Sequence, residues 1–298
     1  MDELKTCSGA ELREVQRIER EALAALLELC CKLQVPCFLM DGAAIGAVRH
    51  RGFIPWDDDL DVGMLRADYR RFLEEAPAIL PSGYTLQTPY NDPDSPYFYS
   101  KLRVDGTVFM EYANRKLDTH HGVYIDICPF DAVPDDPAAD LRQYRRCRRL
   151  IRLFTLRQSP ELSAPPGTPK RKLAAGLRAI LHKGMRLVPR KLLADAIERE
   201  TTRYEGEVTR AVAFLHHPDR HVDYLLRDEL LPLAEGEFDG MEVPLPHDAD
   251  AYLKRHYGDY MNLPPPEDRV GHRLWRVDLG EIPVSETSFA PPPERKNT

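Results

Sequence analysis

Long apolar runs are missing from this 298-residue sequence, so no segment is expected to span a membrane. The N-terminus lacks a basic segment followed by an apolar one, and no signal peptide is expected. The six cysteines show neither a Cys-x-x-Cys pair nor a disulfide-like spacing, which favours a reduced cytosol. These absences predict a globular, cytoplasmic protein.

Acidic residues are nearly absent between Leu141 and Lys191, where 15 Lys and Arg accompany one acid, Glu161. The whole chain nevertheless carries a net charge of −7, so the basic segment stands out and suggests contact with phosphates. Its charges alternate with Leu, Ile, Phe and Met, as in helices that lie on anionic membranes at the inner face of the cell. An ordinary helical subdomain with solvated charges is the alternative. Few aromatics accompany the charges, so no nucleic-acid partner is expected.

The pattern of apolar residues predicts an α+β fold. Helices are predicted over 10–34, 66–75, 137–158, 170–202 and 249–257, with a short helix after Asp41. Strands are predicted over 37–40, 60–64, 97–104, 107–112 and 123–128, and a hairpin near 238–243. We expect a catalytic core over 1–135, a basic helical region over 136–205, a C-terminal part over 206–280 that completes the catalytic domain, and a disordered tail over 281–298.

The stretch IPWDDDLDVGM, residues 54–64, places four carboxylates in five positions. In a strand Asp59 and Asp61 would share one face, while the apolar residues between them share the other. Two carboxylates held so close are tolerable when a divalent ion lies between them. A solvated acidic turn is the alternative. Asp58 is expected to point away from Asp59.

Four further residues are candidates for binding phosphate. The backbone N–H groups of Gly42 and Ala43, at the start of the short helix, could hold a phosphate without a charged side chain. Lys101 and Arg103 alternate on a predicted strand and could neutralise a pyrophosphate or the transition state of its cleavage. For Arg103 a solvated strand edge is the alternative.

Basic residues beside the acidic stretch allow two interpretations. Arg49 and His50 could contact donor phosphates, or they could form ion pairs with the neighbouring aspartates. His216, His217 and His221 have no cysteine nearby, so we expect solvated histidines there in place of a zinc site.

The segment from Asp41 to Met64, DGAAIGAVRHRGFIPWDDDLDVGM, resembles the signature of the LicD family. The resemblance continues through residues 66–69, 101–103, 121–131 and 257–265. The family comprises phosphocholine transferases and their relatives, including fukutin-related ribitol-phosphate transferases. It is similar to a branch of the polymerase-beta-like nucleotidyltransferase fold.

This resemblance implies a nucleotidyltransferase-like mixed sheet with flanking helices, on which Asp59, Asp61 and Asp126 hold Mg²⁺ (or Mn²⁺) and serve catalysis. It implies a LicD-like phosphotransferase that moves phosphocholine, or a similar group, from a CDP-activated donor to a hydroxyl of a glycan or lipid-linked glycan. Lipopolysaccharide and teichoic acid biosynthesis, both forms of cell-surface glycan modification, would use such a step.

Two alternatives stay open at this point. One is a true nucleotidyltransferase that attaches NMP to a small molecule or protein. The other is a non-catalytic nucleotide-binding relative. Family members usually carry Gly-Gly-Thr or Gly-Gly-Ser where this chain has Asp41, Gly42 and Ala43. That difference removes a hydroxyl from the expected phosphate site and leaves the donor preference open.

Overall fold

The computed structural model describes residues 5–162, 168–217 and 223–280, so the tail predicted over 281–298 lies outside the described residues. Its longest helix, α1 (Gly9–Leu33), confirms the helix predicted over 10–34. The helix ends at Gln34, which adopts a left-handed conformation with φ 54° and donates its N–H to the last turn. Its apolar face is buried and packs against strands β4 and β6.

A seven-stranded mixed sheet forms the centre of the molecule. Its strands are, in spatial order, β1 (Phe38–Leu39), β2 (Asp61–Leu65), β6 (Tyr124–Val133), β4 (Ser100–Val104) and β3 (Tyr84–Gln87), with β7 (Ala211–Ala213) on the far half of β6 and β8 (Tyr224–Leu226) beside β7. Strands β2 and β6 run parallel, and the other pairs are antiparallel. With its helices, this mixed sheet confirms the predicted α+β class.

Smaller elements complete the core. The helices are α2 (Asp41–Ile45), which continues as a π-helix η1 (Gly46–His50), α3 (Arg66–Glu75), α7 (Arg227–Leu230) and α8 (Ala249–Tyr257), with single 3₁₀ turns η2 (Ala76–Ala78), η3 (Tyr112–Asn114) and η4 (Pro266–Asp268). The additional strand pairs are β9 (Ala234–Phe238) with β10 (Met241–Leu245), which confirms the predicted hairpin, and β5 (Val108–Glu111) with β11 (Leu274–Asp278). The C-terminal strands therefore return to the core.

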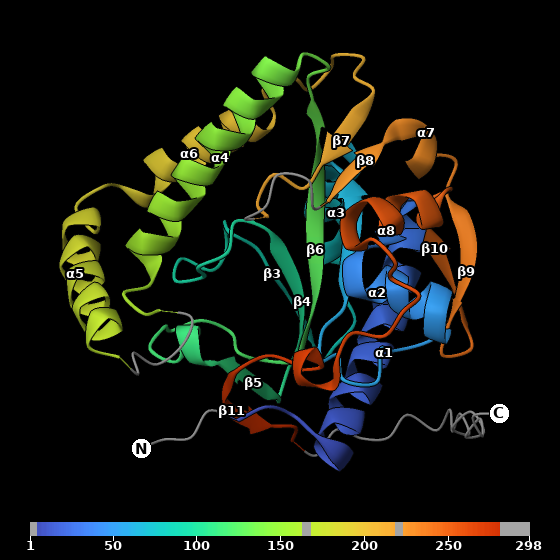
Figure 1. The fold of residues 1–298 in the computed structure, drawn as a ribbon, viewed down its shortest axis with the longest axis horizontal. Helices are drawn as coiled ribbons and strands as arrows, with labels where there is room; N and C mark the ends of the chain where they lie inside the picture. The colour runs from blue at the N-terminus through green and yellow to red at the C-terminus, as the bar shows by residue number, and fades with distance from the viewer. Residues whose placement is uncertain (1–4, 163–167, 218–222, 281–298) are drawn as a thin grey trace.

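Three helices form the basic helical region: α4 (Pro137–Gln158), α5 (Pro169–Met185) and α6 (Arg190–Thr201). Helix α4 has the predicted limits, because Asp136 caps its first turn by accepting from Ala138 N and Ala139 N. The single helix predicted over 170–202 is wrong. Pro189 lacks a backbone N–H and disfavours helical geometry at the residue before it, so the chain forms two helices. In Figure 1 these helices lie on one side of the sheet and α1, α2 and α8 on the other.

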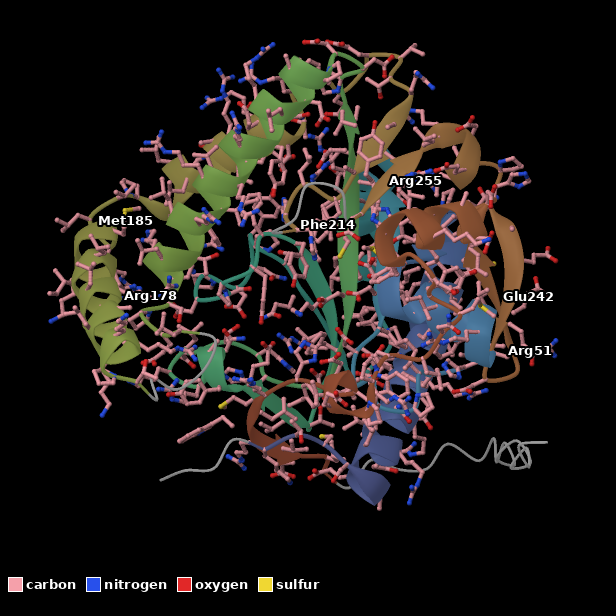
Figure 2. The ribbon with its side chains drawn as sticks, in the orientation of Figure 1. Arg51, Arg178, Met185, Phe214, Glu242 and Arg255 are labelled. Atoms are coloured by element: carbon pink, nitrogen blue, oxygen red, sulfur yellow. The ribbon has the colours of Figure 1, made fainter. Side chains whose placement is uncertain are left out.

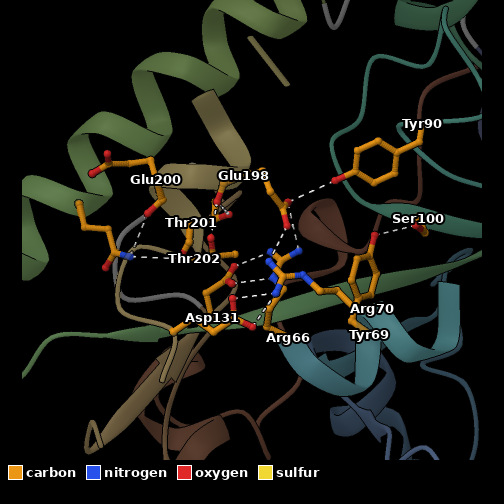
Figure 3. Close-up of polar contacts among 12 residues, drawn as sticks. Arg66, Tyr69, Arg70, Tyr90, Ser100, Asp131, Glu198, Glu200, Thr201 and Thr202 are labelled. Carbon is orange, nitrogen blue, oxygen red and sulfur yellow. Dashed lines mark hydrogen bonds and ion pairs between the residues drawn. The ribbon is translucent and has the colours of Figure 1, made fainter. Parts of the chain in front are cut away.

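A buried ion-pair network joins the helical region to the sheet (Figure 3). Arg66, at the start of α3, donates from Nε and Nη2 to both carboxylate oxygens of Asp131 on β6, each at 2.7 Å. Glu198 of α6 lies 3.6 Å from Arg66 Nη1 and accepts from Arg70 Nη2 at 2.9 Å. We call these four residues the Arg66 network. Both members of its central pair are buried, and each satisfies the other.

Candidate functional site

Two aspartates lie side by side on the central strands of the sheet. Asp61 opens β2 and is paired in parallel register with Asp126 of β6. The N–H of Asp126 donates to the carbonyl of Leu60 at 2.9 Å, which fixes this register. Residues paired across neighbouring strands project from the same face. The structure therefore brings together two of the three predicted metal ligands.

The third, Asp59, precedes β2 and lies next to a histidine from the C-terminal part of the chain. Ligand atoms of Asp58, Asp59 and His272 all lie within 4.8 Å of one another. His272 contacts Asp58 through its backbone N–H at 3.0 Å and its Nδ1 at 2.9 Å, and its Nε2 lies 4.0 Å from Asp59 Oδ2. The expectation that Asp58 points away from Asp59 is wrong, because Asp58 is buried and positions His272.

His272 acts as a cation in this arrangement. Burial alone lowers its pKa, but the hydrogen bond to Asp58 and the charge of Asp59 raise the pKa of His272 to about 10. The Nδ1 side of the ring is bound to Asp58, and Nε2 faces Asp59. His272 and Asp58 thus form an ion pair next to Asp59.

The carboxylates of this site repel one another. Burial, with the charges of Asp59 and Asp126, raises the pKa of Asp61 well above its usual value, and Lys101 opposes this only in part. Burial also raises the pKa of Asp59, which His272 lowers and Asp126 raises again. Within the described residues no group donates a hydrogen bond to the carboxylate of Asp61. The site holds more negative charge than the protein compensates.

Lys101 supplies the one ammonium group paired with these acids among the residues described. It lies opposite Asp126 on β4, is 2% exposed, and forms a short ion pair with the Asp126 carboxylate. Its Nζ is 4.3 Å from the ring centre of Tyr97, 5.3 Å from that of Tyr99 and 3.5 Å from that of Tyr124. Three aromatic faces thus hold the cation in place beside Asp126. The predicted contact of Lys101 with substrate phosphate stays a prediction.

Arg103 is buried among polar partners and lies against an aromatic ring. A solvated strand edge is wrong, because the residue is 4% exposed. Its Nε donates to Gln87 Oε1 and its Nη1 to the Gly122 carbonyl, both at 2.8 Å, and the guanidinium lies over the ring of Tyr124. These contacts give Arg103 a bracing role beneath Tyr124, and its predicted role in binding substrate stays a prediction.

Arg49 and His50 precede the acidic loop, which carries Asp57, Asp58 and Asp59, and their contacts differ from one of the two expectations. Arg49 donates to His50 Nε2 at 2.9 Å and to the Tyr260 carbonyl. In the described part of the chain neither residue forms an ion pair with the aspartates of the loop, so the predicted pairing is wrong. Burial lowers the pKa of His50 and Arg49 lowers it further, so the imidazole is neutral. Binding of donor phosphates by Arg49 and His50 stays a prediction.

Gly42 lies close to the side chain of Asp57. A Cβ at this position would lie 2.6 Å from Asp57 Oδ2, so a larger residue would force the Asp57 carboxylate to move. The neighbouring Ala43 is 3% exposed, so only its backbone could serve a ligand. Phosphate binding by the N–H groups of Gly42 and Ala43 stays a prediction.

A second carboxylate pair, which the sequence did not reveal, adjoins the first. Asp41 adopts φ 47° and accepts from the hydroxyls of Tyr252 at 3.0 Å and Tyr257 at 2.8 Å. Asp223 is fully buried, and among the described residues neither of its carboxylate oxygens has a hydrogen-bond donor. Burial and the charge of Asp41 raise the pKa of Asp223 well above its usual value. The carboxylate of Asp41 is therefore held by two tyrosines of α8.

Glu19 lies beneath the acidic loop and was also missed. It is 1% exposed on the inner face of α1, and no residue that the structure describes donates to its Oε2. Burial raises its pKa well above the usual value, and Asp59 adds to the shift. The helical pattern contains the signal for it, because Glu19 lies four residues from both Val15 and Leu23 on the buried face.

His216 is not solvated as expected. It contacts Phe98, Tyr99 and Phe214, and within the described part of the chain neither ring nitrogen has a hydrogen-bond partner. Burial, with the charge of Arg66, lowers its pKa to about 3, so the ring is neutral. His221 lies outside the described residues.

Comparison with known proteins gives the geometry a context. A model of the LicD/FKTN/FKRP nucleotidyltransferase domain matches residues 34–140, which include Asp59, Asp61 and Asp126. The chain is 26% identical to the lipopolysaccharide cholinephosphotransferase LicD of Haemophilus influenzae over 265 residues, 88% of this chain and 96% of that protein. Shorter similarities link it to uncharacterized proteins of Rickettsia typhi (33% over 88 residues, 28% of each chain) and Rickettsia prowazekii (39% over 59 residues, 20% of this chain and 22% of that protein).

The match over residues 34–140 covers the strands that carry the aspartates, and the similarity to the Haemophilus protein extends over most of both chains. The resemblance first noted in the signature segment is thereby confirmed. Residues 34–140 are therefore similar to the LicD/FKTN/FKRP nucleotidyltransferase domain, and most of the chain is similar to a LicD protein.

Proposed function

We propose that this protein is a metal-dependent cholinephosphotransferase that transfers phosphocholine from a CDP-linked donor to a hydroxyl of lipopolysaccharide or a related glycolipid. The observation that carries the proposal is the pairing of Asp61 with Asp126 on adjacent parallel strands, with Asp59 beside them. The similarity to a lipopolysaccharide cholinephosphotransferase over 96% of its length supports the choice of transferred group and acceptor.

The residues present fit a divalent cation. Mg²⁺ and Mn²⁺ prefer carboxylate oxygens, and the carboxylate of Asp61 has no donor among the described residues. Asp59, Asp61 and Asp126 would hold the ion. When bound, it would neutralise charge on the phosphates and lower the pKa of a bound hydroxyl. A nucleotidyltransferase-like arrangement of sheet and metal is part of the same proposal.

In the reaction, the oxygen of an acceptor hydroxyl forms a new bond to the phosphorus of phosphocholine. The bond from that phosphorus to the CMP oxygen breaks, CMP leaves with the electron pair, and the hydroxyl proton is released. The acidic side chains would orient the donor, and Lys101 would offset charge beside Asp126. Most of the rate enhancement would come from position and charge, because little other chemistry is needed.

The test uses CDP-choline labelled in two places. With Mg²⁺ and lipopolysaccharide, label in the choline methyl groups should move to the glycolipid, and label in the cytidine should stay in soluble CMP. Cytidine label on an acceptor would overturn the proposal in favour of a true nucleotidyltransferase. If neither label moves with Mg²⁺ or Mn²⁺, although a thermal-shift assay shows CDP-choline binding, the chain is a non-catalytic nucleotide-binding relative.

A further inference from the structure

Five arginines line a groove between α4 and α5. They are Arg145, Arg148, Arg149 and Arg152 of α4 and Arg178 of α5, and His216 also lines the groove. The groove has a volume of about 690 Å³, and none of its described lining residues is acidic. That volume is in the range of small-ligand sites, which bury most of a bound molecule. In Figure 2 Arg178 lies on α5, on the side of the molecule opposite to Arg51 and Glu242.

Most of this positive charge is not used by the fold. Within the described residues Arg145, Arg149 and Arg152 form no ion pair or hydrogen bond. Arg178 donates from Nη2 to the Ser159 carbonyl at 3.0 Å, while its Nε is buried without an acceptor. Guanidinium groups that converge without carboxylates are the usual arrangement for binding phosphate.

The outer face of α5 is apolar. Leu173, Leu177, Ile180 and Leu181 follow one another at three- and four-residue spacing, and their exposures range from 50% to 76%. No residue of α5 is buried. Apolar residues arranged in this way beside Lys and Arg are typical of helices that lie in the plane of a membrane interface. No helix of the described residues is long and apolar enough to cross a membrane.

One lining residue of the groove connects to the acidic site through packed side chains. The ring of His216 lies 6.3 Å from that of Tyr99. Tyr99 in turn lies 5.3 Å from the Lys101 ammonium, which is paired with Asp126. The groove and the acidic site are therefore linked through His216, Tyr99 and Lys101.

We propose that the α4–α5 surface binds the phosphate-bearing headgroup of a membrane glycolipid, with the apolar stripe of α5 resting in the bilayer interface. This proposal rests on the proposed function for the identity of the acceptor, but the docking itself does not depend on catalysis. The groove holds the headgroup phosphate by its arginines, and the stripe accounts for leucines that no part of the described protein covers. A bilayer is preferred to a nucleic acid because the exposed side chains between the charges are aliphatic and offer no stacking surface.

Vesicle co-sedimentation tests the proposal with the full chain. The protein should bind vesicles of phosphatidylcholine mixed with phosphatidylglycerol, should not bind phosphatidylcholine alone, and should dissociate as salt rises. A triple variant Arg145→Gln, Arg149→Gln, Arg152→Gln should bind about fivefold more weakly for each arginine removed. A double variant Leu177→Ser, Ile180→Ser should lose binding at high salt first, because only the electrostatic contribution remains.

Matched controls are available elsewhere on the surface. Arg13→Gln, Arg210→Gln, Arg273→Gln removes the same charge from exposed sites outside the helical region, and Val208→Ser, Met261→Ser removes exposed apolar groups there. Both controls should bind as the unaltered protein does. The proposal is overturned if anionic vesicles are not bound at low salt, if the controls weaken binding as much as the groove variants, or if a duplex oligonucleotide displaces the vesicles. An Asp59→Asn variant should bind vesicles normally, which separates failure of docking from failure of catalysis.

Discussion

Two groups of buried charge lie on the same strand, β6, and they are balanced differently. In the Arg66 network the carboxylate of Asp131 receives both of its hydrogen bonds from one guanidinium. At the acidic site the carboxylate of Asp61 has no donor among the described residues, and burial with neighbouring acids raises its pKa. In the Arg66 network the protein itself supplies the hydrogen bonds and the opposite charge that the buried carboxylate needs. At the acidic site a bound cation would have to supply the missing positive charge.

This difference separates a structural role from a chemical one. A buried ion pair with full hydrogen bonding needs nothing from outside, and breaking it leaves an unpaired charge. A cluster of carboxylates with raised pKa values stores repulsion that a bound cation can relieve. The comparison therefore indicates that Arg66 and Asp131 attach the helical region, and it supports the proposed role of Asp59, Asp61 and Asp126 in the reaction.

The largest expected effect comes from breaking the complete group. Arg66→Ala should lower the free energy of unfolding by about 3–5 kcal/mol, because Asp131 would stay buried without a partner. Urea denaturation measures the loss. The double variant Arg66→Met, Asp131→Leu should recover much of it, since no charge is left buried. If Arg66→Ala unfolds at the same urea concentration as the unaltered protein, the network does not hold the helical region.

Asp61→Asn should lower activity without lowering stability, in contrast to Arg66→Ala. Outer partners of metal ligands are worth about 10–100-fold, so removal of a direct ligand should lower kcat by more than about 100-fold. The free energy of unfolding should stay the same or rise, because one of several repelling charges is removed. Asp59→Asn should behave likewise. Transfer of labelled choline and urea denaturation are measured on the same preparations.

The control for that experiment is Asp58→Asn, which keeps the shape of the residue that positions His272. It should reduce activity less than Asp61→Asn does. An Asp61→Asn enzyme with normal turnover would show that the strand pair is not the metal site.

The pH dependence of stability sharpens the comparison further. An aspartate whose pKa is raised in the folded protein binds a proton there more readily than in the unfolded chain, so stability falls as pH rises above the usual value of 3.8. We expect the melting temperature without metal to fall by a few degrees, about 2–4 °C for each kcal/mol, between mildly acidic and neutral pH. Mg²⁺ should oppose this fall and stabilise most at the higher pH. Differential scanning fluorimetry with and without EDTA measures both effects, and an equal Mg²⁺ effect on Asp61→Asn would contradict the assignment.

The smallest expected effect is that of Asp41→Gly. Asp41 has φ 47°, a region that glycine adopts without strain. Relief of this backbone strain should stabilise the folded protein by about 1 kcal/mol. The change also loses hydrogen bonds from Tyr252 and Tyr257, each worth about 1 kcal/mol. The free energy of unfolding should therefore fall by only about 1 kcal/mol. A much larger loss in urea denaturation would show that Asp41 is essential for holding α8.

Sequence patterns were sufficient for most of the fold because its long elements bury one face. Helices α1, α4 and α8 lie where the spacing of apolar residues predicts them. The strands β3, β7, β8 and β11 were missed, since each has three to five residues and too few positions to show a period. The break at Pro189 was overlooked because the basic and apolar pattern continues across it.

The site was predictable only where its residues are close in the sequence. The spacing of Asp59 and Asp61 places them together, and the resemblance to LicD proteins suggested Asp126. His272 and Asp223 reach the site from distant parts of the chain, and no local pattern marks them. The partner of Arg66 lies 65 residues away and could be identified only from the pairing of β6 with its neighbours.

The strand β6 also limits how the chain can change in length. Asp126 and Asp131 are five positions apart, an odd number, so an extended strand directs them to opposite faces of the sheet. One residue inserted between them would turn one of the two to the wrong face, and either the chemistry or the anchoring of α6 would be lost. We therefore expect insertions and deletions to be tolerated in the connection between α4 and α5, while the interval from 126 to 131 keeps its number of residues.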